Sequence, residues 1–171
     1  KGNAFQVRAG TITTPLVGDV AITDAAAEMC ADALASVTIL PVELNIAIRL
    51  ATGTLHEYAA KSVGAVSTSG TAFIPLPLKL GGIASRASAR VQAAGAVTVT
   101  AEVVTTARQH FHYANPVAAG AGNEPSAIIW QPKLVPVLVG PSCFYVQIAA
   151  ATTGPSYYAN FSFIELDTVS V

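Results

Sequence analysis

Residues Leu134 to Ile164 read LVPVLVGPSCFYVQIAAATTGPSYYANFSFI, a stretch of 31 residues without a charged side chain. Two groups of turn-forming residues, Gly140 to Ser142 and Thr152 to Ser156, divide it into short pieces. Within the pieces apolar side chains recur at every second position, as in the run from Phe144 to Ile148. Short alternating runs between turn residues are typical of β-strands. The stretch therefore predicts buried strands in an antiparallel sheet.

The same alternation occurs earlier in the chain. From Pro41 to Leu50 apolar and polar residues alternate, so we expect a strand with its apolar side chains from Val42 to Leu50 on one face. A turn at residues 52–54 then leads to a predicted partner strand over Leu55 to Ala60. Ala96 to Thr106 alternates again and predicts a further strand, with Val97, Val99 and Val103 on one face.

Phe73 to Leu80 contains prolines at 75 and 77. Residues two apart in a strand aim their backbone N–H groups to the same side, and proline has no N–H to donate. A central strand does not tolerate two missing donors on one side. We therefore expect this segment to be an edge strand or an unpaired extended arm.

One segment has a helical pattern. Asp24 to Leu34 reads DAAAEMCADAL, with a capping aspartate, many alanines and apolar residues at helical spacing. We expect one short helix here.

With about eight strands elsewhere, the fold class is all-β: an antiparallel β-sandwich with a jelly-roll-like arrangement and a short helix near the N-terminus. Residues 1–36 are predicted to form an N-terminal arm that anchors the chain or is swapped between subunits, and residues 37–171 the sandwich.

The composition indicates a component of an assembly. Apolar residues make up 52% of the chain, charged residues 11%, and the formal net charge is -1, with a mean hydropathy of +0.53. About 25% charged residues are usual in a soluble domain, which needs them to remain dispersed. We therefore expect other subunits to cover part of the surface.

The lysines and arginines are scattered singly, so we expect no nucleic-acid partner. Prolines and glycines interrupt every apolar run, so we expect no membrane partner.

Few residues suggest chemistry. His110 and His112 would point to the same side of a strand and are the sharpest candidates for a metal site, which three copies around a threefold axis would complete. The alternative interpretation is two solvated or hydrogen-bonded histidines. Glu165 and Asp167 could hold calcium, but a solvated strand end is favoured. Cys30 and Cys143 could pair or be small buried residues. We expect no catalytic residues, no cofactor and no enzyme, because no acid, base and nucleophile converge.

The chain resembles the small single jelly-roll structural proteins of tailed bacteriophages, namely decoration, head-fibre and minor capsid proteins. The resemblance lies in the strand Pro41-Val42-Glu43-Leu44, the uncharged segment Phe73-Ile74-Pro75-Leu76-Pro77 and the closing run from Leu138 to Leu166. It covers residues 37 to 167, and the richness in Ala, Thr, Val and Gly suits it. It implies a location in the virion and contacts with copies of itself, as a homotrimer, and with other capsid proteins.

An alternative is a carbohydrate-binding or adhesin module on the same scaffold, since a fold does not dictate a function. Such a module needs exposed aromatic side chains beside amides. The candidates are Trp130, Tyr157, Tyr158 and Asn160. For Trp130 a place in the core or in an interface is the favoured interpretation.

Overall fold

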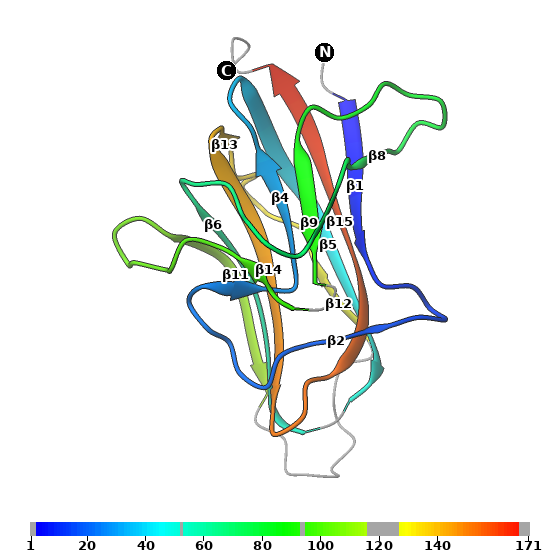
Figure 1. Cartoon of the computed structure of the whole chain (residues 1–171), viewed down its shortest axis with the longest axis vertical. Coiled ribbons are helices and arrows are strands. Elements are labelled where there is room, and N and C mark those ends of the chain that lie inside the picture. Colours follow the sequence, from blue (N-terminus) through cyan, green and yellow to red (C-terminus); the bar gives the residue numbers. More distant parts are fainter. Residues whose placement is uncertain (1–2, 52, 93–94, 116–126, 168–171) are drawn as a thin grey trace.

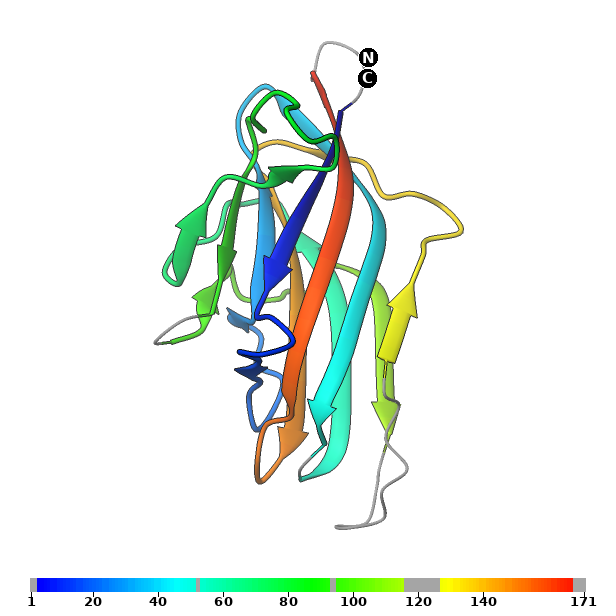
Figure 2. The ribbon, with the colours of Figure 1, turned by 90° about the vertical axis from the view of Figure 1, so that its right-hand side faces the viewer.

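The computed structural model of the chain describes residues 3–51, 53–92, 95–115 and 127–167. Over these residues the chain is built from strands and contains no helix. Two sheets of antiparallel strands lie face to face with the main core between them, as Figure 1 and Figure 2 show from two sides. The predicted all-β, sandwich-like fold is confirmed.

We name each sheet after a central strand. The β5 sheet contains, in order, β12 (Ala127–Trp130), β5 (Val37–Leu50), β15 (Ser156–Asp167), β1 (Asn3–Ala9) and β8 (Leu76–Pro77), while β13 (Leu138–Val139) pairs with β5 and β2 (Leu16–Val17) with β15. The β14 sheet contains β11 (Arg108–Asn115), β6 (Thr54–Val63), β14 (Ser142–Ala151), β4 (Met29–Ala33), β9 (Ser88–Val91) and β7 (Thr71–Phe73). Two short strands, β3 (Ala26–Ala27) and β10 (Val97–Thr98), pair with each other.

The predicted helix over Asp24 to Leu34 is wrong. This segment forms β3 and β4, and β4 lies between β14 and β9. All five residues of β4 are buried. Alanine favours a helix over most other residues by only about 0.7 kcal/mol or less per residue. Pairing on both sides and burial of both faces therefore override the local preference.

The strand predicted from Pro41 to Leu50 is confirmed as part of β5. A β-bulge against β15 at Val42 changes its alternation. Ile39 before the bulge and Leu44 after it are both buried in the same core, although an uninterrupted strand would point them to opposite faces. The predicted apolar face therefore begins at Leu44 rather than at Val42, and Leu50 at its end is exposed.

The predicted pairing of β5 with the segment Leu55 to Ala60 is wrong. That segment belongs to β6, which pairs with β11 and β14 in the other sheet. The turn after β5 therefore carries the chain across the sandwich. Sequence alternation predicts a strand but does not say in which sheet the strand lies.

The proline-containing segment lies at sheet edges, as predicted. β7 is the last strand of the β14 sheet, and β8, which contains Pro77, is the last strand of the β5 sheet. Pro75 falls between them, outside both strands. The missing N–H donors thus leave no gap within either sheet.

Stacked aromatic rings connect the two sheets through the core. Phe144 of β14 and Phe161 of β15 are fully buried, and their ring centroids lie 4.5 Å apart at an interplanar angle of 13°. The stack continues to Phe163 and Phe5 on one side and to Trp130 on the other. These rings hold the two layers together.

A second, smaller core covers the outer face of the β14 sheet. Val97 and Val99 are buried there against Cys143 and Tyr145, and Lys61 of β6 forms an ion pair with Glu102 of the covering segment. The strand predicted over Ala96 to Thr106 is therefore wrong beyond the short β10. The rest of this segment packs over the outer face of the β14 sheet without pairing as a strand, and Val103 is exposed.

The first 36 residues contribute to both sheets. β1 pairs with β15 and β8, and β4 pairs with β14 and β9. Within the described residues, position 36 marks no boundary in the fold. Asn3 of β1 pairs with Glu165 of β15, so β1 begins and β15 ends at the same pole of the sandwich, as Figure 1 shows.

Candidate functional site

The first surface of interest is the segment from Ile74 to Ile83, which we call the 74–83 flank. It runs from edge strand β7 past edge strand β8. Leu80 is 96% exposed, so this large apolar side chain is almost entirely in solvent. A groove of about 340 Å³ is lined by residues of the flank and by Gln6 and Arg8 of β1, the strand with which β8 pairs. The exposed large apolar residues of the flank are Ile74, Leu76, Leu78, Leu80 and Ile83.

The second surface is the segment from Ile129 to Val139, which we call the 129–139 flank. It connects β12 to β13, and Leu134 within it is 88% exposed. A groove of about 510 Å³ lies between this segment and side chains that include Arg108 and His110 of β11. The exposed large apolar residues of this flank are Ile129, Leu134, Val135, Val137 and Val139.

The two flanks lie at opposite edges of one sheet. β12 is the first strand of the β5 sheet and β8 is the last. In Figure 2 the 129–139 flank, in yellow, and the 74–83 flank, in green, are on opposite sides of the molecule. Clustered exposed apolar side chains mark interaction sites more often than scattered ones do. The molecule therefore presents two different apolar surfaces facing away from each other.

His110 and His112 do not point to the same side, so that part of the prediction is wrong. A bulge at His110 shifts the register between β11 and β6. The His110 ring stacks on Phe144 with centroids 5.8 Å apart, and its Nε2 lies 2.8 Å from the Ser62 Oγ. His112 faces outward and pairs with Glu57 at 3.7 Å.

The surroundings of His110 affect its titration. Burial, with the nearby Arg108 charge as a smaller cause, lowers the pKa of His110. Because the two rings lie on different faces of the sheet, the structure does not bring them together as a ligand pair within one chain.

The aromatic candidates for glycan binding are divided between the core and the surface. Tyr157 is fully buried. Trp130 is half-buried, and its ring stacks on Phe144 at 5.7 Å, in agreement with the interpretation as a core aromatic. Tyr158 and Asn160 are half-buried on the outer face of β15.

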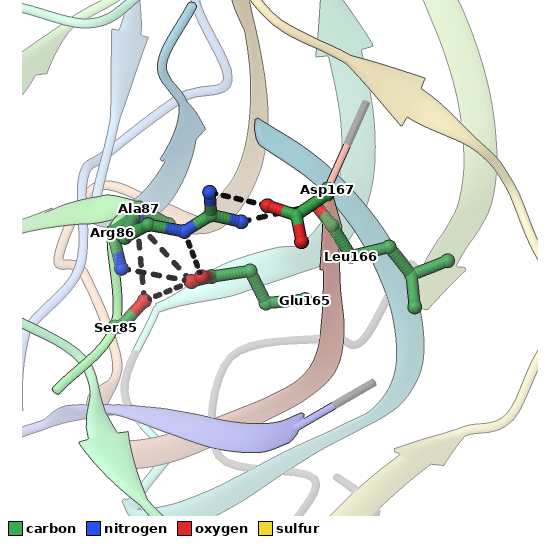
Figure 3. A network of polar contacts seen from close by, with 6 residues as sticks. All are labelled: Ser85, Arg86, Ala87, Glu165, Leu166 and Asp167. Atoms are coloured by element: carbon green, nitrogen blue, oxygen red, sulfur yellow. Dashed lines mark hydrogen bonds and ion pairs between the residues drawn. The ribbon is translucent and has the colours of Figure 1, made fainter. Parts of the chain in front are cut away.

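Glu165 is the centre of a polar network shown in Figure 3. Its carboxylate accepts hydrogen bonds from the Ser85 hydroxyl at 2.5 Å, the Arg86 backbone N–H at 3.0 Å and the Arg86 Nε at 3.1 Å. Arg86 also pairs with Asp167 at 2.5 Å. Glu165 is buried, so the expectation of a solvated strand end is wrong for this residue. The network fastens the segment before β9 to the end of β15.

A second buried carboxyl group, that of Glu28, lies close to Asp19. Glu28 accepts backbone hydrogen bonds from Ile148 at 2.8 Å and from Asp19 at 3.3 Å. Burial, with the Asp19 charge as a smaller cause, raises the pKa of Glu28 to about 8. Glu28 therefore carries a proton at neutral pH.

The two cysteines are neighbours in the fold. Cys30 of β4 pairs in register with Tyr145 of β14, and Asp32 pairs with Cys143. Both thiols are free and buried, and the ligand atoms of Cys30, Asp32 and Cys143 all lie within 4.8 Å of one another. Sequence reasoning noted the cysteines but missed Asp32. In a strand, Cys30 and Asp32 lie two residues apart and so share one face. The helix predicted over Asp24 to Leu34 hid this relation.

No protein-family model, no curated protein and no solved structure matches this chain. Over the described residues there is also no helix with the length and apolar character needed to span a membrane.

Proposed function

We propose that this chain is a structural subunit of a virus particle, a capsid decoration, head-fibre or minor capsid protein that works through contacts with copies of itself and with other capsid proteins. The observation that carries the proposal is the pair of exposed apolar flanks at opposite edges of a chain with only 11% charged residues. Burial of such flanks between subunits explains how a chain this poor in charge remains soluble.

The strand order supports a jelly roll as the finer description of the fold. The four neighbours β12, β5, β15 and β1 of one sheet face the four neighbours β11, β6, β14 and β4 of the other. Successive strands alternate between the sheets, from β1 to β4, β5 and β6. Such an interleaved order is that of the double-sheet jelly roll, an architecture shared by viral capsid and lectin domains. The segment containing β7 to β10 is then an insertion between β6 and β11.

Two unlike surfaces on opposite edges favour a head-to-tail contact. When one surface binds a different surface on the next copy, the subunits close into a ring if the rotation between them allows it. A twofold dimer would instead use the same patch on both copies. We propose that the ring is a homotrimer, as the resemblance implies, in which the 74–83 flank of one subunit covers the 129–139 flank of the next.

Light scattering of the purified chain tests the assembly. We expect a particle mass of three times the chain mass of 17.4 kDa at micromolar concentration. Leu80→Glu and Leu134→Glu should each reduce the particle to a monomer, because each places a charge in an apolar contact. Val104→Glu is the matched control, since Val104 is 95% exposed but lies on neither flank. A wild-type chain that is monomeric at this concentration would overturn the proposal.

Mixing the two variants tests the head-to-tail arrangement. A Leu80→Glu chain keeps its 129–139 flank intact, and a Leu134→Glu chain keeps its 74–83 flank intact. One contact can then form between the two chains and none beyond it, so the mixture should contain dimers while each variant alone stays monomeric. A mixture that stays monomeric, or one that rebuilds full trimers, contradicts the arrangement.

A glycan-binding module is the second candidate, and one observation favours it. Asn160 pairs in register with Asn45 on one side and Arg8 on the other, beside Tyr158 on the same outer face of the β5 sheet. Amides, a guanidinium and an aromatic ring are groups that bind sugars. If this function holds, a glycan array gives signals that Asn160→Ala reduces at least about tenfold, the equivalent of about 1.4 kcal/mol. Ser162→Ala on the same face is the control, and an array without signals removes the candidate.

A further inference from the structure

Three metal-ligating side chains gather on the outer face of the β14 sheet, away from both flanks. Cys30 and Asp32 alternate along β4 and so share a face, and Cys143 lies across from Asp32 on β14. The two sulfur atoms and a carboxylate oxygen are within 4.8 Å of one another. In a tetrahedral zinc site, Zn–S bonds of 2.3 Å and Zn–O bonds of about 2.1 Å place the ligand atoms roughly 3.5–3.8 Å apart. The three groups therefore need only small side-chain rotations to share one ion.

The carboxylate of Asp32 is buried, and hydroxyl and backbone N–H groups hold it. It accepts hydrogen bonds from the Ser67 backbone N–H and hydroxyl, both at 2.8 Å, and from the Ser88 hydroxyl at 3.3 Å. No ion pair between described residues includes Asp32. A buried charge is normally paired or coordinates a metal. The Cys143 thiol also hydrogen-bonds to this carboxylate, so a metal ion that replaces the thiol proton would keep the two groups together.

We propose that Cys30, Cys143 and Asp32 bind one Zn²⁺ ion, with the Ser67 hydroxyl at the fourth position. Two thiolates select a soft or borderline ion, and the added carboxylate favours zinc over copper(I). Ser67 Oγ lies 2.9 Å from Cys30 Sγ and 2.8 Å from the Asp32 carboxylate, so it is already next to two of the three ligands. The site would have the closed surroundings of a structural zinc centre rather than the open position of a catalytic one.

Zinc binding would link β4 and β14 to the segments that pack on the outer face of the β14 sheet. Ser67 belongs to the connection between β6 and β7, which lies over β4, and its neighbour Thr68 exchanges backbone hydrogen bonds with Thr98 of β10. The two thiols lose their protons as the Zn–S bonds form, so one zinc ion releases two protons.

Refolding with zinc tests the proposal. The chain is unfolded with EDTA and a phosphine reductant, refolded with a small excess of Zn²⁺, desalted and analysed for metal. We expect one zinc per chain and a thermal midpoint about 5–10 °C above that of the metal-free chain at saturating zinc. Co²⁺ in place of zinc should give the near-ultraviolet charge-transfer absorption of thiolate–cobalt bonds, a signature that a merely structural cysteine pair would not produce.

Variants locate the site. Cys30→Ser, Cys143→Ser and Asp32→Asn should each lose the charge-transfer band or at least about 100-fold in zinc affinity, while far-ultraviolet circular dichroism checks their folding. The double variant His110→Gln, His112→Gln is the matched control and should keep one zinc per chain. Should any cysteine variant fail to fold, protection of the wild-type thiols from alkylation by added zinc gives the same answer. The proposal is overturned if refolded chains hold no zinc, or if the histidine variant loses it and the cysteine variants keep it.

Discussion

Phe144→Ala is expected to reduce the free energy of unfolding by about 3–5 kcal/mol. Phe144 is fully buried and its ring contacts Phe161 of the opposite sheet, with Trp130 and His110 stacked nearby. Truncation removes the main stacking contact between the two layers and leaves a cavity that rigid strands cannot fill. Typical domains have 5–15 kcal/mol in total, so the variant should lose a large fraction of its stability.

Urea unfolding followed by circular dichroism measures this loss, at one fixed protein concentration because subunit association also contributes to stability. Phe73→Ala is the matched control: Phe73 lies half-buried in edge strand β7, and its loss should cost about 1 kcal/mol. Equal losses for the two variants would show that the stack does not hold the sheets together.

The second large effect concerns pH. Between pH 4.5, the ordinary pKa of a glutamic acid, and about 8, the pKa of Glu28 in the folded chain, the unfolded chain has released the Glu28 proton and the folded chain still holds it. The folded state therefore binds more protons in this window, and the free energy of unfolding falls as the pH rises through it. The slope approaches 1.36 kcal/mol per pH unit in the middle of the window and is smaller near each pKa, so the change between pH 4.5 and pH 8 is about 4 kcal/mol.

Glu28→Gln should remove this slope. The amide has one acceptor oxygen for the two N–H groups that Glu28 now accepts, so the variant should lose about 1 kcal/mol at pH 4.5. At pH 8 it should instead be about 3 kcal/mol more stable than the wild type, because the wild type then loses stability by ionising a buried group.

Unfolding curves at pH 5 and pH 8, with EDTA present to keep Cys30 and Cys143 free of metal, measure the difference. Glu43→Gln is the control and should keep the wild-type slope, since Glu43 lies on β5 at the surface and hydrogen-bonds to Gln131. The interpretation of Glu28 as a proton-carrying carboxyl is wrong if Glu28→Gln keeps that slope as well.

The strands were predictable because alternation in the sequence reflects burial of one strand face. The run from Phe144 to Ile148 and the prolines 75 and 77 both gave the correct structure. The errors have physical causes. The bulge at Val42 breaks the alternation without a sequence pattern of its own, and the alanines of β4 favour a helix when the partner strands are ignored.

The candidate sites were less predictable, because contacts between distant strands create them. Cys30 and Cys143 are 113 positions apart, and only the pairing of β4 with β14 brings them together with Asp32. His110 and His112 were predicted to be neighbours, but a bulge that depends on the partner strand separates them. The low charge content, by contrast, indicated an apolar surface without indicating that it would divide into two flanks.

The pairing of Asn3 with Glu165 has a practical consequence for protein engineering. Because β1 begins beside the end of β15, a short linker between them would close the backbone into a circle without crossing the sandwich. New termini could then be opened in a surface connection, a rearrangement that adjacent ends generally tolerate. A fluorophore or fusion domain could thereby be moved from one pole to the other, which gives a direct way to map which pole faces a docking partner.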